Sequence, residues 1–304
     1  MTKAWIGGRL SEGFALTWGT LRELLPQWLR RDRPVVPVVR LTGVVGFSTP
    51  LRPGLTMAGT ARTLDRVFAI GNASAVALAI NSPGGSPAQS HLIFRRIREL
   101  AREKNRHVIA FVEDAAASGG YMLACAADEI IADPNSIVGS IGVVGSSFGF
   151  DKLLAKIGVE RRLYTSGEHK AMLDPFLPEN PEDVARLKRL QREIHDDFIS
   201  VVKSRRGGKL KGADDSLFSG EFWTGRQGLE LGLVDGIGEL RSTLRERFGD
   251  KVVTPLVSAD RGLFGRRIFG TARGELLQGG LAPSLAADMI SALEARALWA
   301  RYGL

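Results

Sequence analysis

Two residues of the chain combine a hydroxyl group with an amine that could take its proton. Ser118 lies in the segment Ala-Ala-Ala-Ser-Gly-Gly-Tyr, and Lys170 follows 52 residues later in Ser-Gly-Glu-His-Lys-Ala-Met. A serine hydroxyl with a nearby base is one of the few two-residue arrangements that produce a nucleophile for acyl transfer. The pair therefore predicts a serine peptidase.

The segments around Ser118 predict a site at the end of a buried strand. Residues 107–112 form an apolar, β-branched run typical of a strand, and a turn of small residues leads to a predicted helix over 118–127. Amide groups at a helix start have no partner inside the helix, so they can stabilise an oxyanion that forms beside Ser118. The alternative is that Ser118 only caps this helix.

A second glycine turn precedes the first by one strand. The apolar run 76–80 leads into Asn-Ser-Pro-Gly-Gly-Ser and then into a predicted helix over 87–104. Ser86 is the expected N-cap, Pro87 occupies the first helical position, and Gln89 completes a predicted capping box. The two turns could supply the two halves of an oxyanion hole, although this turn could equally be a plain connection between strand and helix.

At this point the sequence resembles the S49 peptidases of the signal peptide peptidase A type, in their short, single-domain form. The segments that carry the resemblance are Ile80–Gly85, Ala117–Tyr121, Ile137–Val143, Ser166–Lys170 and Trp223–Asp235. They occur in this order between about residues 35 and 240, which makes the joint signal specific. The resemblance implies an α/β fold of the Clp protease/crotonase group with a mostly parallel sheet. It also implies a serine endopeptidase with a Ser-Lys dyad.

The resemblance assigns roles to individual residues. It implies Ser118 as the nucleophile, Lys170 as the general base, and Gly84 with Gly119 as oxyanion donors. Gly85 is an equal candidate to Gly84. Ser140 matches the family serine whose hydroxyl orients the lysine. No cofactor and no metal is implied.

A lysine base needs a dry environment, because the reference pKa of about 10.4 keeps an exposed lysine protonated at neutral pH. We therefore expect Lys170 to be buried, and we expect the nearby Glu168 and Asp174 to point away from its amine. The alternative is an exposed lysine in a polar loop. His169 is not expected to be the base, and His195, on a charged helix, is expected to have a solvated or capping role.

Composition predicts an ordinary globular chain without a metal centre. The 304 residues are 44% hydrophobic and 24% charged, and the single cysteine, Cys125, is expected to lie in the core. One cysteine excludes an internal disulfide and fits a reducing compartment. No CxxC or HExxH motif is present, so a zinc site is not predicted.

The net charge of +8 is concentrated at the two ends. Residues 1–40 carry seven Lys or Arg against three Asp or Glu, and residues 261–304 carry six against three. We expect three regions: a basic amphipathic segment over 1–34, a peptidase domain over 35–254 and a basic helical appendage over 255–304. Amphipathic helices near 14–25 and 285–297 would lie on an anionic membrane surface or between subunits. Nucleic acid is not an expected partner, because the charge does not lie on the core.

No segment reaches the 18 to 20 or so apolar residues that cross a bilayer, and no apolar run of a signal peptide opens the chain. We therefore expect a cytoplasmic protein, with peripheral contact to the inner face of the membrane.

The remaining elements follow from periodicity. Predicted strands cover 35–45, 129–132, 137–144 and 159–165, and predicted helices cover 59–70 and 150–157. A long helix is expected over 181–204, capped by Asn180, with a glycine-rich basic loop over 205–212.

The resemblance also implies partners and substrates. Family members assemble into rings, and in short members the lysine comes from a neighbouring protomer. Extended hydrophobic peptides, such as signal peptides or membrane-protein fragments, are the implied substrates. Two other functions stay open: a crotonase-like acyl-CoA enzyme that uses the two turns without a nucleophile, and a catalytically silent membrane scaffold.

Overall fold

The computed structural model describes residues 33–46, 54–258, 293 and 296–304. The described residues from Pro34 onward belong to one compact unit. The predicted helix over 14–25 and most of the appendage over 255–304, including most of its predicted helix, lie outside the described residues.

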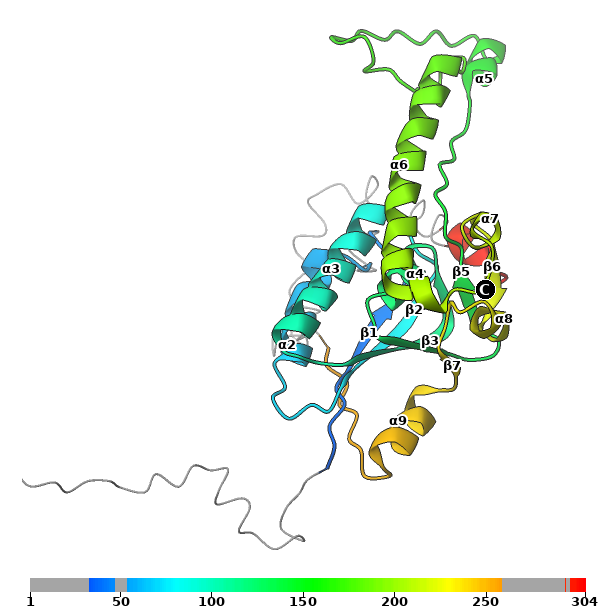
Figure 1. Ribbon diagram of the computed structural model, residues 1–304. Helices are drawn as coiled ribbons and strands as arrows, with labels where there is room; N and C mark the ends of the chain where they lie inside the picture. The colour runs from blue at the N-terminus through cyan, green and yellow to red at the C-terminus, as the bar shows by residue number, and fades with distance from the viewer. Residues whose placement is uncertain (1–32, 47–53, 259–292, 294–295) are drawn as a thin grey trace, which may run out of the picture. The chain divides into compact units, whose positions relative to one another are not determined.

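A mostly parallel sheet forms the centre of this unit (Figure 1). Its main path runs in the order β1 (Val38–Thr42), β2 (Val76–Ser82), β3 (Val108–Ala117), β4 (Glu129–Ala132) and β7 (Gly236–Ile237), with every neighbouring pair parallel. A short strand β5 (Ile137–Gly139) pairs parallel with the end of β3, and β6 (Phe222–Thr224) pairs antiparallel with β5. The predicted α/β fold with a mostly parallel sheet is confirmed.

The central strands are buried on both faces, which explains why they appear in the sequence as unbroken apolar runs. Side chains at Leu78 and Ala110 belong to a large core on the side of α2 (Met57–Phe68), α3 (Pro87–Glu103) and α4 (Gly119–Ala124). Their neighbours Ala79 and Phe111 point to a smaller core, which α9 (Leu240–Phe248) covers. The two-residue period of a strand divides one apolar run between these two cores.

The longest helix is α6 (Pro181–Arg206), and its start is where the sequence predicts it. The Asn180 side chain accepts a hydrogen bond from the Glu182 amide, and Pro181 occupies the first turn. The remaining helices are short: α5 (Asp151–Lys156), the 3₁₀ turn η1 (Gly207–Lys209), α7 (Asp214–Leu217) and α8 (Gly225–Glu230).

Several predicted elements differ from the structure. The strand predicted over 137–144 ends at Gly139, and β3 continues to Ala117 where a turn was predicted after residue 112. Residues 159–165 form no strand, and the predicted basic loop over 205–212 begins inside α6. Arg206 is only 3% exposed, because its guanidinium donates to the Gly232 carbonyl and to Asp235. A buried partner on a distant segment thus turns a sequence that is typical of a loop into the end of a helix.

The predicted capping box of α3 is only half formed. The Ser86 hydroxyl accepts from the Gln89 amide as expected, but the Gln89 side chain accepts from the Met57 amide at 2.8 Å instead of from Ser86. Gln89 therefore links α3 to the start of α2. A complete capping box occurs at Thr224 and Gln227 of α8, which the sequence analysis missed.

Residues 253–257 lie beside β1. The Val38 amide donates to the Pro255 carbonyl, and the Val257 amide donates to the Val38 carbonyl. Among the described residues no helix is both long and apolar enough to span a membrane. Nor does this part of the chain contain a group of three or more His, Cys, Asp or Glu side chains that could hold a metal ion.

Candidate active site

Ser118 lies directly between β3 and α4 in a strained backbone conformation. Its φ is 52° and its ψ is −123°, in a region that side-chain-bearing residues rarely adopt. Such a conformation costs on the order of 1–3 kcal/mol and persists only where the surroundings impose it. A sharp strand-to-helix turn of this kind presents a serine hydroxyl to solvent. Ser118 is half-buried, and its side chain makes no capping bond to α4, so the N-cap alternative does not describe it.

The end of β3 holds Ser118 in this conformation. Ala115, Ala116 and Ala117 are fully buried, and their small side chains allow β5 to pair closely with this part of β3. The Ser118 amide donates to the Gly139 carbonyl at 2.8 Å. The strand therefore runs up to the nucleophile candidate without the intervening turn that the sequence predicted.

The glycine turn after β2 contacts Ser118 from the other side. A Cβ atom on Gly84 would lie 2.8 Å from Ser118 Cβ and from the Gly119 amide nitrogen, so only glycine fits. The Gly84 amide donates to the Ser82 hydroxyl, whereas the amides of Gly85 and Gly119 have no acceptor in the described part of the chain. Gly85 and Gly119 also line one small pocket with Ser118. Of the two glycines that the sequence left open, Gly85 is the one whose amide has no acceptor among the described residues.

Ser140 is buried beside the end of β5 and is also strained, with φ of 53°. Its amide donates to the Glu221 carbonyl at 2.7 Å, which fixes the backbone where β5 meets β6. Among the described residues only four non-glycine positions have positive φ. Ser118 and Ser140 are two of them, and this clustering is typical of functional sites.

Lys170 lies in a turn and is exposed in the single chain. The neighbouring His169 side chain contacts Arg186 in the second turn of α6, whereas Ser118 shares its pocket with Ile194 and Phe198 further along α6. Eight residues of helix separate Arg186 from Ile194, a rise of about 12 Å. One chain by itself therefore does not bring Lys170 to Ser118, as the position of α5 and the adjoining turn in Figure 1 also indicates.

The carboxylates near Lys170 have other partners. Asp174 pairs with Arg161 and accepts from the Phe176 amide, and these hydrogen bonds lower the pKa of Asp174. Glu168 lies 4.0 Å from the imidazole of His169. In the part of the chain that the structure describes, no carboxylate forms an ion pair with the Lys170 amine, in line with the expectation that Glu168 and Asp174 do not pair with it.

His195 is not a solvated residue, contrary to the sequence-based expectation. It is half-buried on α6, and its Nε2 lies 3.1 Å from the Ile141 carbonyl oxygen, to which it can donate. Ile141 follows Ser140 directly. His195 therefore ties α6 to the segment that carries the lysine-orienting candidate.

The pocket beside Ser118 has apolar walls. Met122, Val143, Ile194 and Phe198 line it, and its volume is about 20 Å³. This is room for roughly one water molecule.

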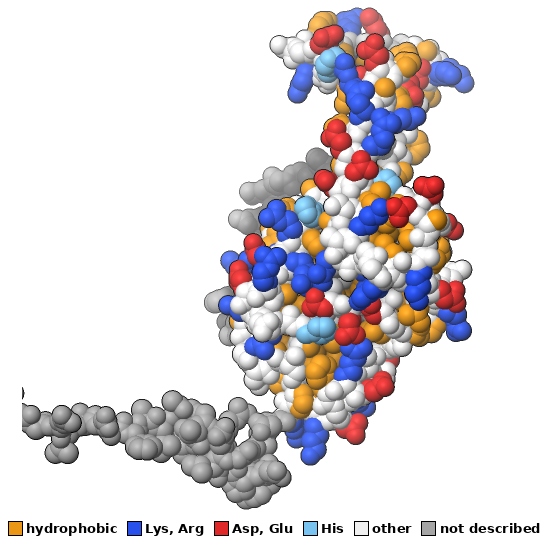
Figure 2. Space-filling model, viewed as in Figure 1, with side chains coloured by type: hydrophobic (Ala, Val, Ile, Leu, Met, Phe, Trp, Pro, Cys, Tyr) orange, Lys and Arg blue, Asp and Glu red, His pale blue; other side chains and the backbone are white. Residues whose placement is uncertain are grey.

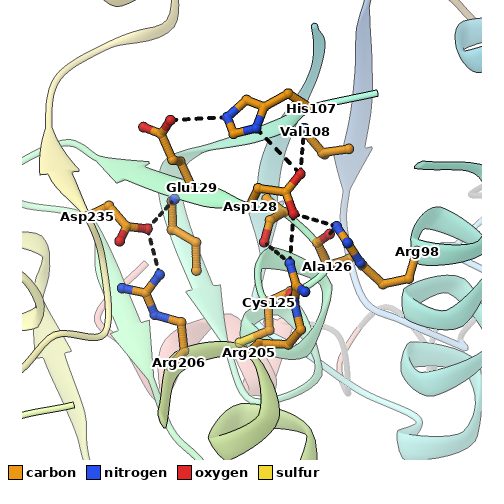
Figure 3. Close-up of polar contacts among 12 residues, drawn as sticks. Arg98, His107, Val108, Cys125, Ala126, Asp128, Glu129, Arg205, Arg206 and Asp235 are labelled. Atoms are coloured by element: carbon orange, nitrogen blue, oxygen red, sulfur yellow. Dashed lines mark hydrogen bonds and ion pairs between the residues drawn. The ribbon is translucent and has the colours of Figure 1, made fainter. Parts of the chain in front are cut away.

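A polar cluster holds the end of α6 against the sheet (Figure 3). Asp128 accepts from Arg98 and Arg205, and Asp235 accepts from Arg206 and Lys209. Cys125 is buried next to this cluster, and burial raises the pKa of its thiol to about 12. The thiol is therefore protonated at neutral pH, which leaves it in the core role that the sequence predicts and not as a nucleophile.

Sequence reasoning missed two features of this site. The His195 contact depends on a helix crossing that no local pattern reports. Tyr302 is buried, and its hydroxyl donates to Ser140 Oγ at 3.2 Å across 162 positions of sequence. Tyr302 lies in a segment that the sequence analysis assigned to an appendage.

Comparisons with known proteins were made for the whole chain. The model of Peptidase family S49 matches residues 100–254. A putative protease of Methanocaldococcus jannaschii is 33% identical over 219 residues, which cover 67% of this chain and 68% of that protein. A solved membrane-bound stomatin-specific protease, in a mutant form, aligns with a TM-score of 0.42 and 18% identity over 74% of this chain and 94% of that one.

A Na⁺/H⁺ antiporter of Brucella abortus is 54% identical over 299 residues, which cover 97% of this chain and 40% of that protein. The chain thus spans less than half the length of this relative. A match of this extent carries nothing from the antiporter's name to this chain.

Proposed function

Because the chain belongs to peptidase family S49, we propose that it is a serine endopeptidase whose Ser118 is activated by Lys170 of a neighbouring copy. The observation that supports this most directly is the backbone of Ser118. Ser118 is half-buried in a strained turn and makes no capping bond, and it lies next to two glycine amides that have no acceptor in the described part of the chain.

In the proposed reaction, the Ser118 hydroxyl oxygen forms a bond to the carbonyl carbon of the scissile peptide while the neutral Lys170 amine takes the hydroxyl proton. The amides of Gly85 and Gly119 donate to the oxyanion that develops. The carbon–nitrogen bond then breaks, and the proton passes from lysine to the leaving amine. A water molecule then attacks the carbonyl carbon of the acyl-enzyme while the same amine takes a proton from the water. The bond between that carbon and the Ser118 oxygen breaks, the proton returns to Ser118, and the carboxylic acid product is released.

Ser140 is proposed to orient the lysine. Its hydroxyl lies at the end of β5, whose Gly139 carbonyl holds the Ser118 amide. An amine that reaches Ser118 from a second copy would therefore pass the Ser140 hydroxyl.

The neighbouring copy is proposed because Lys170 is exposed and lies far from Ser118 along α6. Burial against a second chain would also provide the dry environment that a lysine base needs. Several large apolar side chains near Lys170 are exposed and available for such a contact. They include Phe148, Leu153, Ile157, Val159, Tyr164 and Leu177.

The proposed substrates are extended hydrophobic peptides, such as signal peptides or membrane-protein fragments. The apolar walls of the pocket beside Ser118 support this class. Contact of the basic regions 1–34 and 255–304 with an anionic membrane, at the inner face, is proposed from their charge. Co-sedimentation with phosphatidylglycerol vesicles, compared with phosphatidylcholine vesicles, tests the membrane contact.

Labelling with a fluorophosphonate probe tests the nucleophile and the base. Ser118→Ala should abolish labelling, and Lys170→Ala should lower its rate about 10³-fold or more. Lys104→Ala, which changes an exposed lysine at the end of α3, is the matched control and should label at the wild-type rate. Labelling that survives Ser118→Ala would contradict the nucleophile, and CoA-thioester turnover by that variant would favour the crotonase-like alternative.

Mixing the two inactive variants tests the shared site. If Lys170 acts across subunits, randomly mixed oligomers should recover labelling at about one quarter of the sites, because each wild-type Ser118 then meets a wild-type lysine half of the time. Mass spectrometry of the intact assemblies verifies the mixing. No recovery in verified mixed oligomers would place the dyad within one chain.

A further inference from the structure

Two extended segments on either side of α5 have no backbone partners. The segments 142–148 and 159–165 belong to no helix or strand, and segment 142–148 leads from β5 to α5 (Figure 1). In the described part of the chain, the backbone amides of residues 142–148 and 160–165 donate to no acceptor, and their carbonyl groups accept from no donor. Unpaired extended backbone of this kind is a template for strand pairing with another chain.

The sequence of segment 159–165 is typical of a strand, although it forms none in the single chain. Val159, Leu163 and Tyr164 are residue types that favour strands. This preference reflects the packing of a strand against its neighbours, so a strand without a neighbour gains little from it. The exposed apolar side chains of the two segments are Val144, Phe148, Val159, Leu163 and Tyr164. The missing element is therefore a partner strand that would cover them.

One antiparallel register brings the apolar side chains of the two segments together. The opposed pairs are Leu163 with Val144, Tyr164 with Val143, and Val159 with Phe148. Apolar side chains that lie directly opposite each other on antiparallel strands stabilise the pairing. A slip by one residue in either direction would place Gly149 or Ser147 opposite Val159. The side chains therefore favour a single register.

The same register directs Lys170 to the proposed site. It places Ser166 opposite Ile141, which follows Ser140. Four residues of chain lead from Ser166 to Lys170 and span at most about 14 Å, so the amine comes within reach of the Ser140 hydroxyl. A pairing of two backbone segments thus sets the position of the proposed base.

We propose that segment 159–165 of one copy adds to segment 142–148 of a second copy as an antiparallel strand, with Leu163 opposite Val144. The proposal rests on the proposed function, because it states how a neighbouring copy delivers Lys170. The second copy is the partner because one chain leaves both segments unpaired. In this mode of recognition the backbone hydrogen bonds provide affinity, and the alternating side chains provide specificity.

Disulfide cross-linking tests the pairing without any need for activity. Val144→Cys and Leu163→Cys chains are co-expressed with different tags and oxidised with copper phenanthroline. Opposed residues of an antiparallel pair have Cβ atoms about 4.5–5.5 Å apart, so a disulfide-linked dimer that carries both tags should form. Each variant oxidised alone should give no dimer. The native Cys125 is buried and is present in every sample.

The matched control uses Arg162→Cys in place of Leu163→Cys. Its yield of dimer with Val144→Cys should be lower by about fivefold or more, because neighbouring residues of a strand point to opposite faces. No dimer with Leu163→Cys, or equal yields from the two positions, would overturn the pairing. In a chain that carries Val144→Cys and Leu163→Cys together, a disulfide formed within the chain would overturn the role of the second copy.

Proline substitutions test whether the backbone takes part. Neighbouring amides of a strand point alternately toward and away from its partner, so only one of Arg161→Pro and Arg162→Pro should remove a bond between copies. That variant should raise the protein concentration of half-association by roughly tenfold over the matching alanine variant, as measured by sedimentation velocity. Equal effects of the two prolines, whether both strong or both absent, would overturn the strand pairing.

Labelling by the fluorophosphonate probe separates this pairing from the peptidase function. If no form of the protein labels, the peptidase function is contradicted, and cross-linking and sedimentation still decide whether the two segments pair.

Discussion

At the scale of single residues, Ser118 and Ser140 keep a conformation that glycine would adopt at lower cost. Both have positive φ, and both are held by hydrogen bonds between neighbouring segments. Strain of this kind is maintained by the surrounding sheet and is expected to lower stability. The side chain is retained at each position, which is consistent with a chemical role.

A comparison of two variants measures the strain at Ser118. Ser118→Gly should be more stable than Ser118→Ala by about 1 kcal/mol, because glycine relieves the positive φ and alanine does not. Thermal unfolding of the two variants gives the difference. Ala117→Gly, one residue earlier in β3, is the control and should lower stability by roughly 0.5–1 kcal/mol. If Ser118→Gly is the less stable of the two Ser118 variants, the turn is not strained.

The His195 contact predicts a positioning role. His195→Ala should slow Ser118 labelling several-fold, because the Ile141 carbonyl loses its bond to α6 and Ser140 is held less firmly. His195→Gln keeps an N–H donor of similar reach and should restore part of the rate. His91→Gln on α3 serves as the control. Equal labelling by wild type and His195→Ala would show that the contact is only structural.

At the scale of elements, the end of α6 is held by ion pairs that couple stability to pH. Burial raises the pKa of Asp235, but hydrogen bonds from Arg206, Lys209 and the Ile130 amide lower this pKa by a larger amount. The net shift is therefore downward. The pKa of Asp128 is also lowered, because the effect of burial is outweighed by the hydrogen bond from the Val108 amide and by Arg98 and Arg205. The stability from such groups is present above the unfolded-state value of about 3.9 and is lost as pH falls through the folded pKa.

Asp235→Asn isolates this contribution. The variant should lose about 3–5 kcal/mol at neutral pH, because the buried Arg206 guanidinium is left without its carboxylate. Urea unfolding between pH 7 and pH 3 should show a smaller loss of stability in the variant than in the wild type as the pH falls. Parallel pH profiles for the two proteins would contradict the assigned coupling.

At the scale of the whole molecule, the surface near Lys170 carries large apolar side chains that the described unit leaves exposed. Phe148 is 79% exposed and lies in a row of three aromatic rings with Phe150 and Phe176. Figure 2 shows hydrophobic side chains between charged ones over the region of α5 and the start of α6. Exposed apolar side chains in such a group are typical of a surface that contacts another chain.

Phe148→Asp should weaken self-association and lower Ser118 labelling, because fewer copies then receive Lys170 from a neighbour. In a dilution series, the sedimentation coefficient and the labelling rate should fall together. In the variant this fall should occur at a higher protein concentration than in the wild type. Leu92→Asp, which changes an exposed leucine of α3, is the control. A monomeric wild type with full labelling at every concentration would contradict the shared site.

The sequence by itself determined the features that depend on neighbouring residues. The runs 76–80 and 107–112 predicted β2 and the start of β3, and Asn180 with Pro181 predicted where α6 begins. The turns that follow β2 and β3 identified Ser118 and its adjacent glycines as candidates. These signals are local, because strand period, capping and turn chemistry act over a few residues.

Only the tertiary structure decided which of these groups meet. It paired the Gly84 amide with the Ser82 hydroxyl and gave the Gly85 amide no acceptor within the described residues. It also brought His195 to Ile141 and Tyr302 to Ser140. It also kept Lys170 away from Ser118 in the single chain. These outcomes depend on helix crossings and on contacts between positions as far as 162 residues apart, and no local pattern encodes them.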